Sequence, residues 1–205
     1  MSLAGIVLAA GRSSRMGSPK ALLDFRGEPF VLRILEALEA LDLKTRLVVV
    51  GPRHEAKDIR ALLSQHDCLV IENQDIEGGP IASLRAGLAA VHTIQPTGVL
   101  VWPVDLPHVR VDTVERLVDV FRRNSPFAVV PRFGARRGHP IIWGSAAFAE
   151  LEASDAATKD GARAVLHTHV AEVREVPVDD PAVIDDLNTR EDYERLVREI
   201  NRDAY

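Results

Sequence analysis

Five short segments of the chain are almost wholly apolar, and segments with helical spacing lie between them. Apolar runs of this length are typical of strands covered on both faces, as in a parallel sheet. The intervening segments carry apolar stripes with a period of about 3.6 residues, which predicts helices. The apolar runs are 6–10, 47–50, 68–71, 99–102 and 127–130. The stripes are Val31, Ile34, Leu35 and Leu38, then Ile81, Leu84, Leu88 and Val91, then Val114, Leu117, Val118 and Phe121.

This alternation predicts an α/β fold with a layered sheet and right-handed crossovers, whose ligand site lies beyond the carboxyl ends of the strands. After residue 130 the pattern loosens, and segments 127–131 and 140–143 have the pattern of two strands of a hairpin around the basic turn 132–138. A last helix is expected from about residue 189. A chain of 205 residues suits one domain over residues 1–205.

Two pairs of residues have the spacing of a helical capping box. Asp112 and Glu115 precede the third stripe, and Thr189 and Asp192 precede the last helix. We therefore expect each pair to mark a helix start.

Composition and charge exclude several classes of protein. Hydrophobic residues make up 46% of the chain and charged residues 27%, as in an ordinary globular protein. The net charge of -5 and the 5% of aromatic residues are unsuited to binding nucleic acid. The apolar runs are too short to span a bilayer. One cysteine cannot form an intrachain disulfide, and no basic segment precedes the first apolar run. We expect a cytoplasmic protein whose partners are neither nucleic acid nor membrane.

The segment from Gly5 to Lys20 joins an apolar strand to a loop rich in glycine, serine and basic residues. Glycines let backbone N–H groups surround an anion, and Arg15 and Lys20 supply charge to offset phosphate oxygens. The loop is not a Walker A motif, because five residues rather than four separate its two glycines. It is not GxGxxG either, because Ala9 and Arg12 occupy glycine positions. These features favour phosphate binding over hydride transfer; the alternative is a solvated surface loop.

Acidic residues at two further positions could hold a magnesium ion. Asp105 follows the apolar run that ends at Trp102, so it lies at the carboxyl end of a predicted strand. Mg²⁺ is commonly bound by one or two carboxylates together with phosphate oxygens. Asp186 or Asn188 would complete its shell. The alternatives are that Asp105 caps the next helix and that the acidic residues before Thr189 only favour the positive end of the last helix.

Taken together, these residues resemble the nucleotidyltransferases of molybdenum cofactor biosynthesis, relatives of the sugar-phosphate and methylerythritol-phosphate nucleotidyltransferases. The resemblance implies a three-layer, Rossmann-like fold of the glycosyltransferase A type, with a mostly parallel sheet and helices on both faces. The similar segments occur in the same order: LAAGRSSRMGSPK at 8–20, ENQDIEGGPIASLRAGL at 72–88, PVDLP at 103–107, RGHP at 137–140 and DLNTREDY at 186–193.

The resemblance also implies roles for individual residues. The expected catalytic residues are Arg15, Lys20 and Asp105, and the expected metal ligands are Asp105 and Asp186. His139 lies where the family's acceptor binds, and Arg136 and Arg137 beside it would meet the acceptor's phosphate or form a solvated turn. The expected nucleotide-binding residues are Leu8, Ala9, Ala10, Gly11, Asn73, Gly79 and Ser83.

The implied reaction transfers a nucleoside monophosphate from an NTP to a phosphate-bearing acceptor, molybdopterin by resemblance, with Mg²⁺ as cofactor and pyrophosphate as leaving group. A phosphate monoester is largely dianionic at neutral pH, so the protein's task is positioning and charge neutralisation. A molybdoenzyme or its chaperone would receive the product.

The nucleotide and the acceptor stay open at this point. CMP is favoured over GMP because LAAG at 8–11 resembles the cytidine branch of the family, although Leu106 stands where that branch typically has glutamine. The rival functions are nucleotidyl transfer to a sugar phosphate or another metabolite, and nucleotide binding without catalysis.

Overall fold

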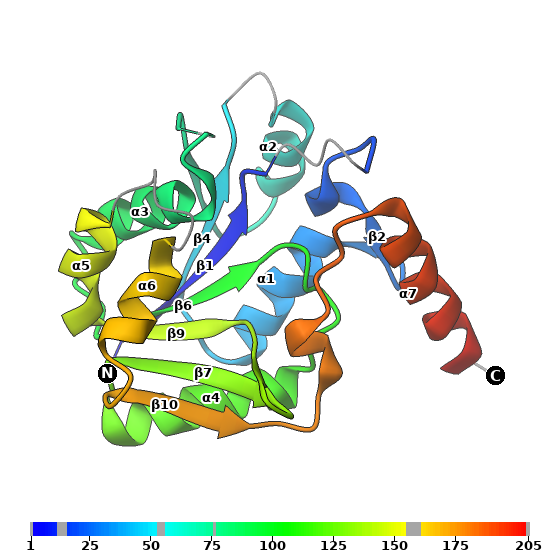
Figure 1. The fold of residues 1–205 in the computed structure, drawn as a ribbon. Helices are drawn as coiled ribbons and strands as arrows, with labels where there is room; N and C mark the ends of the chain where they lie inside the picture. The colour runs from blue at the N-terminus through cyan, green and yellow to red at the C-terminus, as the bar shows by residue number, and fades with distance from the viewer. Residues whose placement is uncertain (1, 12–15, 53–55, 76, 155–160, 204–205) are drawn as a thin grey trace.

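The protein is built around a sheet with strand order β10-β7-β9-β6-β1-β4-β5, with β8 paired to β7 outside this path (Figure 1). The computed structural model describes residues 2–11, 16–52, 56–75, 77–154 and 161–203. The strands of the sheet are β1 (Leu3–Ala9), β4 (Thr45–Val50), β5 (Leu69–Glu72), β6 (Gly98–Pro103), β7 (Ala128–Phe133), β8 (Arg136–Arg137), β9 (Ile141–Gly144) and β10 (Val173–Pro177).

Most neighbouring strands run parallel, as predicted. β1 is parallel to β4 and β6, β4 to β5, and β7 to β10. β7 and β9 pair antiparallel, with Ala128 opposite Trp143, so the predicted hairpin is present. β9 is also antiparallel to β6. It is therefore β9 that reverses direction within the main path of the sheet, and β7 runs parallel to β6.

Helices cover both faces of the sheet, which confirms the three-layer α/β prediction. One hydrophobic cluster joins α1, α2, α4 and α7 to one face, and a second joins α3, α5 and α6 to the other (Figure 1). All three predicted apolar stripes are buried in these clusters. The helices are α1 (Phe30–Ala40), α2 (Lys57–Leu63), α3 (Gly79–Val91), α4 (Val111–Asn124), α5 (Phe148–Ala153), α6 (Gly161–Thr168) and α7 (Arg190–Asp203).

Shorter elements connect this framework. A small hairpin of β2 (Asp24–Phe25) and β3 (Glu28–Pro29) precedes α1. The 3-10 turns are η1 (Lys20–Leu22), η2 (Ser145–Ala147) and η3 (Pro181–Ile184). Within the part of the chain that the structure describes, every helix is too short or too polar to cross a membrane.

Two expectations about these elements are wrong. The run 68–71 is not covered on both faces, because β5 is the last strand on its side of the sheet and leaves Leu69 50% exposed. Asp112 and Glu115 form no capping box, because α4 begins at Val111 and no side chain of its own first turn caps it.

The other capping box is present. The Thr189 hydroxyl accepts a hydrogen bond from the backbone N–H of Asp192 at 3.2 Å, and the Asp192 carboxylate accepts one from the N–H of Thr189 at 2.8 Å. This reciprocal pair fixes the start of α7.

Candidate active site

A cavity of about 590 Å³ opens beyond the carboxyl ends of β1 and β6, where the α/β pattern predicts a ligand site. Its size is in the range that holds a small ligand. Residues from several distant segments line it. They include Leu8, Ala9, Ala10 and Gly11; Lys20; Gly78, Gly79, Pro80, Ile81 and Ser83; Asp105; and His139 and Asp186.

Asp105 is held at the mouth of this cavity by the strands beside it. The N–H of Val104 donates to the carbonyl of Leu8 at 3.0 Å, which ties the loop after β6 to the end of β1. The indole of the buried Trp102 donates to the carbonyl of Leu106 at 2.9 Å. Leu106 itself is fully buried, so its side chain faces the core. Asp105 is therefore fixed at the cavity and does not cap α4.

Lys20 connects the amino-terminal segment to two acidic or polar loops. Its Nζ donates to Asp105 Oδ2 at 3.0 Å and to Asn188 Oδ1 at 2.9 Å. The side chains of Lys20 and Asp105 are only 14% and 22% exposed, so water screens this contact less than it would a surface ion pair. The structure thus brings together three predicted positions that lie far apart in the sequence.

Asp186 and His139 lie close enough to Asp105 for their charges to interact. Burial raises the pKa of the Asp186 carboxyl, and the negative charge of Asp105 raises it further, against the lowering effect of His139 and Lys20. Burial lowers the pKa of His139. At neutral pH the imidazole of His139 is therefore neutral, and it faces the cavity together with the side chains of Asp105 and Asp186.

The donor set of Asp105 and Asp186 fits a divalent cation. The charge of Asp105 raises the cost of ionising Asp186, and a positive ion between the two side chains would lower that cost. Among the described residues, no group of three or more His, Cys, Asp or Glu side chains is arranged for a metal. Mg²⁺ does not need one, because it takes one or two carboxylates and completes its shell with phosphate oxygens and water.

The predicted nucleotide-binding segment around residue 79 forms one wall. Asn73 Nδ2 donates to the carbonyl of Asp75 and to Ser83 Oγ, each at 3.0 Å, and the Asp75 carboxylate accepts from the N–H of Gly78 at 2.8 Å. Gly79 adopts φ +66°, a conformation that favours glycine. Asn73 is buried and supports this wall from behind, whereas Gly79 and Ser83 line the cavity.

The remaining predicted residues are divided. Arg15 lies outside the described residues. His139 lines the cavity. Arg137, predicted to meet the acceptor's phosphate, pairs its guanidinium with Glu175 at 2.7 Å. Arg136 is exposed on β8.

Several residues that contact or support the cavity have no place in the predicted set. Gly161, Ala162 and Arg163 at the start of α6 line it, as does Trp143 of β9. Asp185 binds Arg195 rather than facing the cavity. The segment 161–163 neither follows a predicted strand nor carries a capping motif. The sequence therefore holds no pattern that would have predicted its place in the site.

Comparison with known proteins identifies the family. The model of the MobA-like NTP transferase domain matches residues 5–173. The chain belongs to this family. The MobA-like NTP transferases are nucleotidyltransferases, so the predicted family and enzyme class are confirmed.

Individual relatives extend the comparison. A probable molybdenum cofactor guanylyltransferase of Pyrococcus horikoshii is 31% identical over 65% of this chain and 64% of its own length. A nicotine blue oxidoreductase of Paenarthrobacter nicotinovorans is 34% identical over 94% of this chain and 95% of its own.

Solved structures support the same fold. The crystal structure of Rv0371c from Mycobacterium tuberculosis is 32% identical, with a TM-score of 0.80, over 97% of this chain and 98% of that one. A second structure of Rv0371c is a complex with manganese, with a TM-score of 0.75 and 29% identity over 97% of this chain and 99% of that one.

Proposed function

We propose that this MobA-like protein transfers a nucleoside monophosphate, CMP in preference to GMP, from the NTP to the phosphate group of molybdopterin and releases pyrophosphate. The observation that carries the proposal is the contact of Lys20 with both Asp105 and Asn188 at the mouth of the cavity. One cation and three oxygen-bearing side chains, counting Asp186, meet there beside the Gly11 loop.

The side chains would act by position and charge. A phosphate oxygen of the acceptor attacks the α-phosphorus of the NTP, and the bond from that phosphorus to pyrophosphate breaks. Both reactants are anionic, so Lys20, and Arg15 as predicted from the sequence, would offset their repulsion. The backbone of Leu8 to Gly11 would hold the base and the Gly79 wall the rest of the nucleotide. His139 is neutral at pH 7, so it would orient the acceptor rather than neutralise its charge.

Asp105 and Asp186 would hold Mg²⁺, which when bound shares the negative charge of the triphosphate. The manganese complex of Rv0371c supports the use of a divalent cation. Asn188 would keep Lys20 directed at the same place.

The preference for CMP rests on the floor of the cavity. Ala10 lines it on the side of the cluster that contains Ile81 and Trp143, and it carries a methyl group that glycine would lack, whereas the Ala9 side chain belongs to the cluster on the other face of the sheet. Less room beside β1 favours the smaller pyrimidine base. Replacing Ala10 with glycine should therefore shift binding towards GTP, as calorimetric titration with CTP, GTP, ATP and UTP would measure.

Pyrophosphate release tests the whole proposal. The protein is incubated with Mg²⁺, each NTP in turn, and either molybdopterin or a sugar phosphate. Release with CTP and molybdopterin, lost in Asp105→Ala and kept in the exposed control Asp179→Ala, is the expected result. Release only with a sugar phosphate would refute the acceptor, and NTP binding without release under any condition would refute catalysis.

Similarity to the nicotine blue oxidoreductase favours a second candidate, a redox activity in the same cavity, because that similarity spans nearly the whole chain. Its test is oxidation of NADH or NADPH in the presence of nicotine blue, followed by absorbance. Redox turnover that survives Asp105→Ala, without pyrophosphate release by the wild-type protein, would favour this candidate over nucleotidyl transfer.

A further inference from the structure

The segment that brings Asp186 to the cavity presents alternate residues to opposite sides. Asp186 lines the cavity, and Asn188 accepts the hydrogen bond from Lys20. Asp185 binds Arg195 instead, and Leu187 is fully buried in the core. Alternation of this kind is typical of extended backbone. The two residues that face away from the cavity therefore set where the other two point.

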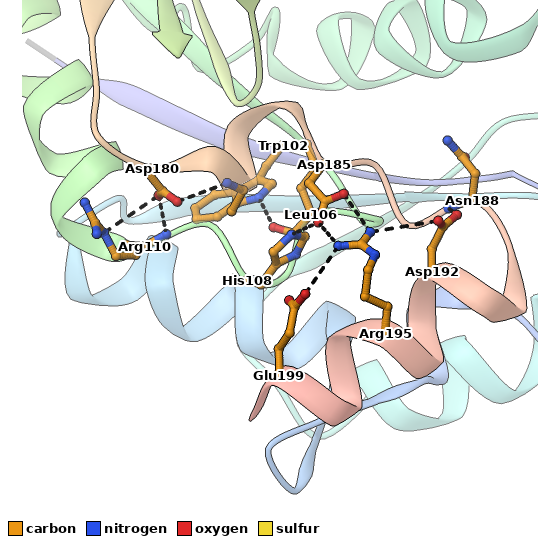
Figure 2. A network of polar contacts seen from close by, with 11 residues as sticks. Trp102, Leu106, His108, Arg110, Asp180, Asp185, Asn188, Asp192, Arg195 and Glu199 are labelled. Carbon is orange, nitrogen blue, oxygen red and sulfur yellow. Dashed lines mark hydrogen bonds and ion pairs between the residues drawn. The ribbon is translucent and has the colours of Figure 1, made fainter. Parts of the chain in front are cut away.

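Two hydrogen bonds from Arg195 of α7 hold the carboxylate of Asp185. The Arg195 guanidinium donates to Asp185 Oδ1 at 2.7 Å from Nη2 and to Oδ2 at 2.9 Å from Nη1 (Figure 2). Such paired bonds between planar groups fix orientation as well as distance. His108 Nε2 lies 3.4 Å from Asp185 Oδ2 on the same side.

Arg195 is itself fixed within α7. Its guanidinium lies 3.9 Å from Asp192 Oδ1 and 3.8 Å from Glu199 Oε1. Asp192 also caps the helix through Thr189 and accepts a bond from the N–H of Asn188 at 3.1 Å. The helix thus holds both ends of the segment from Asp185 to Asn188.

This arrangement also links α7 to the loop of Asp105. The side chains of Arg195 and Asp185 are 39% and 32% exposed, so water partly screens the ion pair, while its paired geometry holds the two groups in one orientation. The bond from the N–H of Leu187 to the carbonyl of Asp105 at 3.2 Å links this segment directly to the loop of the predicted metal ligand.

We infer that Arg195 is a positioning residue: through Asp185 it sets the place of Asp186 relative to Asp105, and so the affinity of the site for a divalent cation. The inference rests on the proposed function. Residues that orient a metal-binding carboxylate are typically worth about 10- to 100-fold in metal affinity.

Binding of Mn²⁺ alone to the full chain, followed by the electron paramagnetic resonance signal of the free ion, tests the inference. Arg195→Gln should weaken binding about tenfold and change the spectrum of the bound ion. Arg195→Lys, which keeps the charge but not the paired geometry, should bind with intermediate affinity. The matched control is Arg190→Gln, which removes another α7 arginine, one that pairs with Glu194 at 3.3 Å. It should bind as the wild-type protein does.

The outcomes separate this inference from the function on which it rests. Wild-type affinity in a folded Arg195→Gln protein would overturn the role of Arg195 and leave the proposed function standing. Absence of Mn²⁺ binding by the wild-type protein would overturn the inference, whereas the proposed function, in which the phosphates of the nucleotide complete the shell of the cation, is tested by pyrophosphate release. If Arg195→Gln does not fold, Arg195→Lys decides: weaker binding at an unchanged melting temperature supports the inference, and wild-type binding overturns it.

Discussion

Asp180 joins two segments that lead to the candidate site, so its removal should lower the stability of the whole protein. Its side chain is 4% exposed. The carboxylate accepts a hydrogen bond from the N–H of Arg110 at 3.0 Å (Figure 2). It also accepts hydrogen bonds from the hydroxyl of Thr113 at 2.8 Å and the N–H of Ala182 at 3.2 Å. It thereby holds the start of α4, which follows the Asp105 loop, against η3, which precedes Asp186.

The expected loss of stability in Asp180→Ala follows from these contacts. A hydrogen bond to a charged group contributes about 1.5–3 kcal/mol, so three at the lower end give about 4–5 kcal/mol. Removing the carboxylate also relieves the cost of burying its charge. We expect the free energy of unfolding to fall by about 3 kcal/mol, and the melting temperature by about 6–12 °C for a chain of this size. Asp180→Asn, which keeps one oxygen acceptor, should lose about half as much.

Urea unfolding followed by circular dichroism measures the change, with the slope of the transition as a check on two-state behaviour. The control is Asp179→Ala, because Asp179 is exposed and offers Arg110 only its backbone carbonyl, at 2.9 Å. Equal stability of the Asp179→Ala and Asp180→Ala proteins would refute the reasoning, since it would mean that the buried carboxylate contributes nothing beyond its exposed neighbour.

Three further predictions concern separate parts of the molecule. Lys20→Met should lower the rate of pyrophosphate release by about 100-fold or more while the melting temperature changes little, because the ammonium offsets the negative charge of the two reactants. Unchanged turnover would contradict this role. Hydrogen bonds that His169 donates to Glu172 and then to Glu150 raise the pKa of His169, so its protonated ring stabilises the fold below about pH 6.5 and this contribution is lost as the pH rises through the raised pKa. His169→Gln should therefore destabilise the protein more in urea unfolding at about pH 5.5 than at about pH 9, and an equal effect at both would be inconsistent with the ion pairs. Gly138→Ala should lower stability by about 1–3 kcal/mol, because the added Cβ would lie against the Val183 backbone, 2.7 Å from its carbonyl carbon; an unchanged urea midpoint would count against this clash.

The sequence predicts most strands of the sheet and the helices α1, α3, α4 and α7 because their patterns are local, and it gives no prediction for α2, α5 and α6. Each apolar stripe repeats within a few turns, and the capping box at Thr189 spans only three residues. The same local reasoning fails for α4, where Asp112 and Glu115 have the right spacing but the capping carboxylate is Asp180, 70 residues from Arg110. Spacing along the chain carries no information about such a partner. The exposure of Leu69 could not be predicted from the sequence either, because it depends on which strand is the last in the sheet.

The two parts of the candidate site that the sequence predicts best both follow strands. Leu8 lies opposite Pro103 in the parallel pair β1 and β6, so the loops after these two strands must emerge side by side. That arrangement brings the Gly11 loop and Asp105 together whatever the loops contain. Their juxtaposition is therefore a property of the fold class.

The third part, from Asp185 to Asn188, follows no strand directly. It reaches the cavity from η3 and is placed by contacts to the Asp105 loop, to Lys20 and to α7. Contacts between side chains distant in sequence thus decide where Asp186 lies, and the sheet does not. Changes at Asp180 or Arg195 should for this reason affect cation binding more than they affect the order of the strands. The parts of the site outside the sheet are then also those in which related proteins of this fold can differ in ligand and reaction while β1 and β6 stay the same.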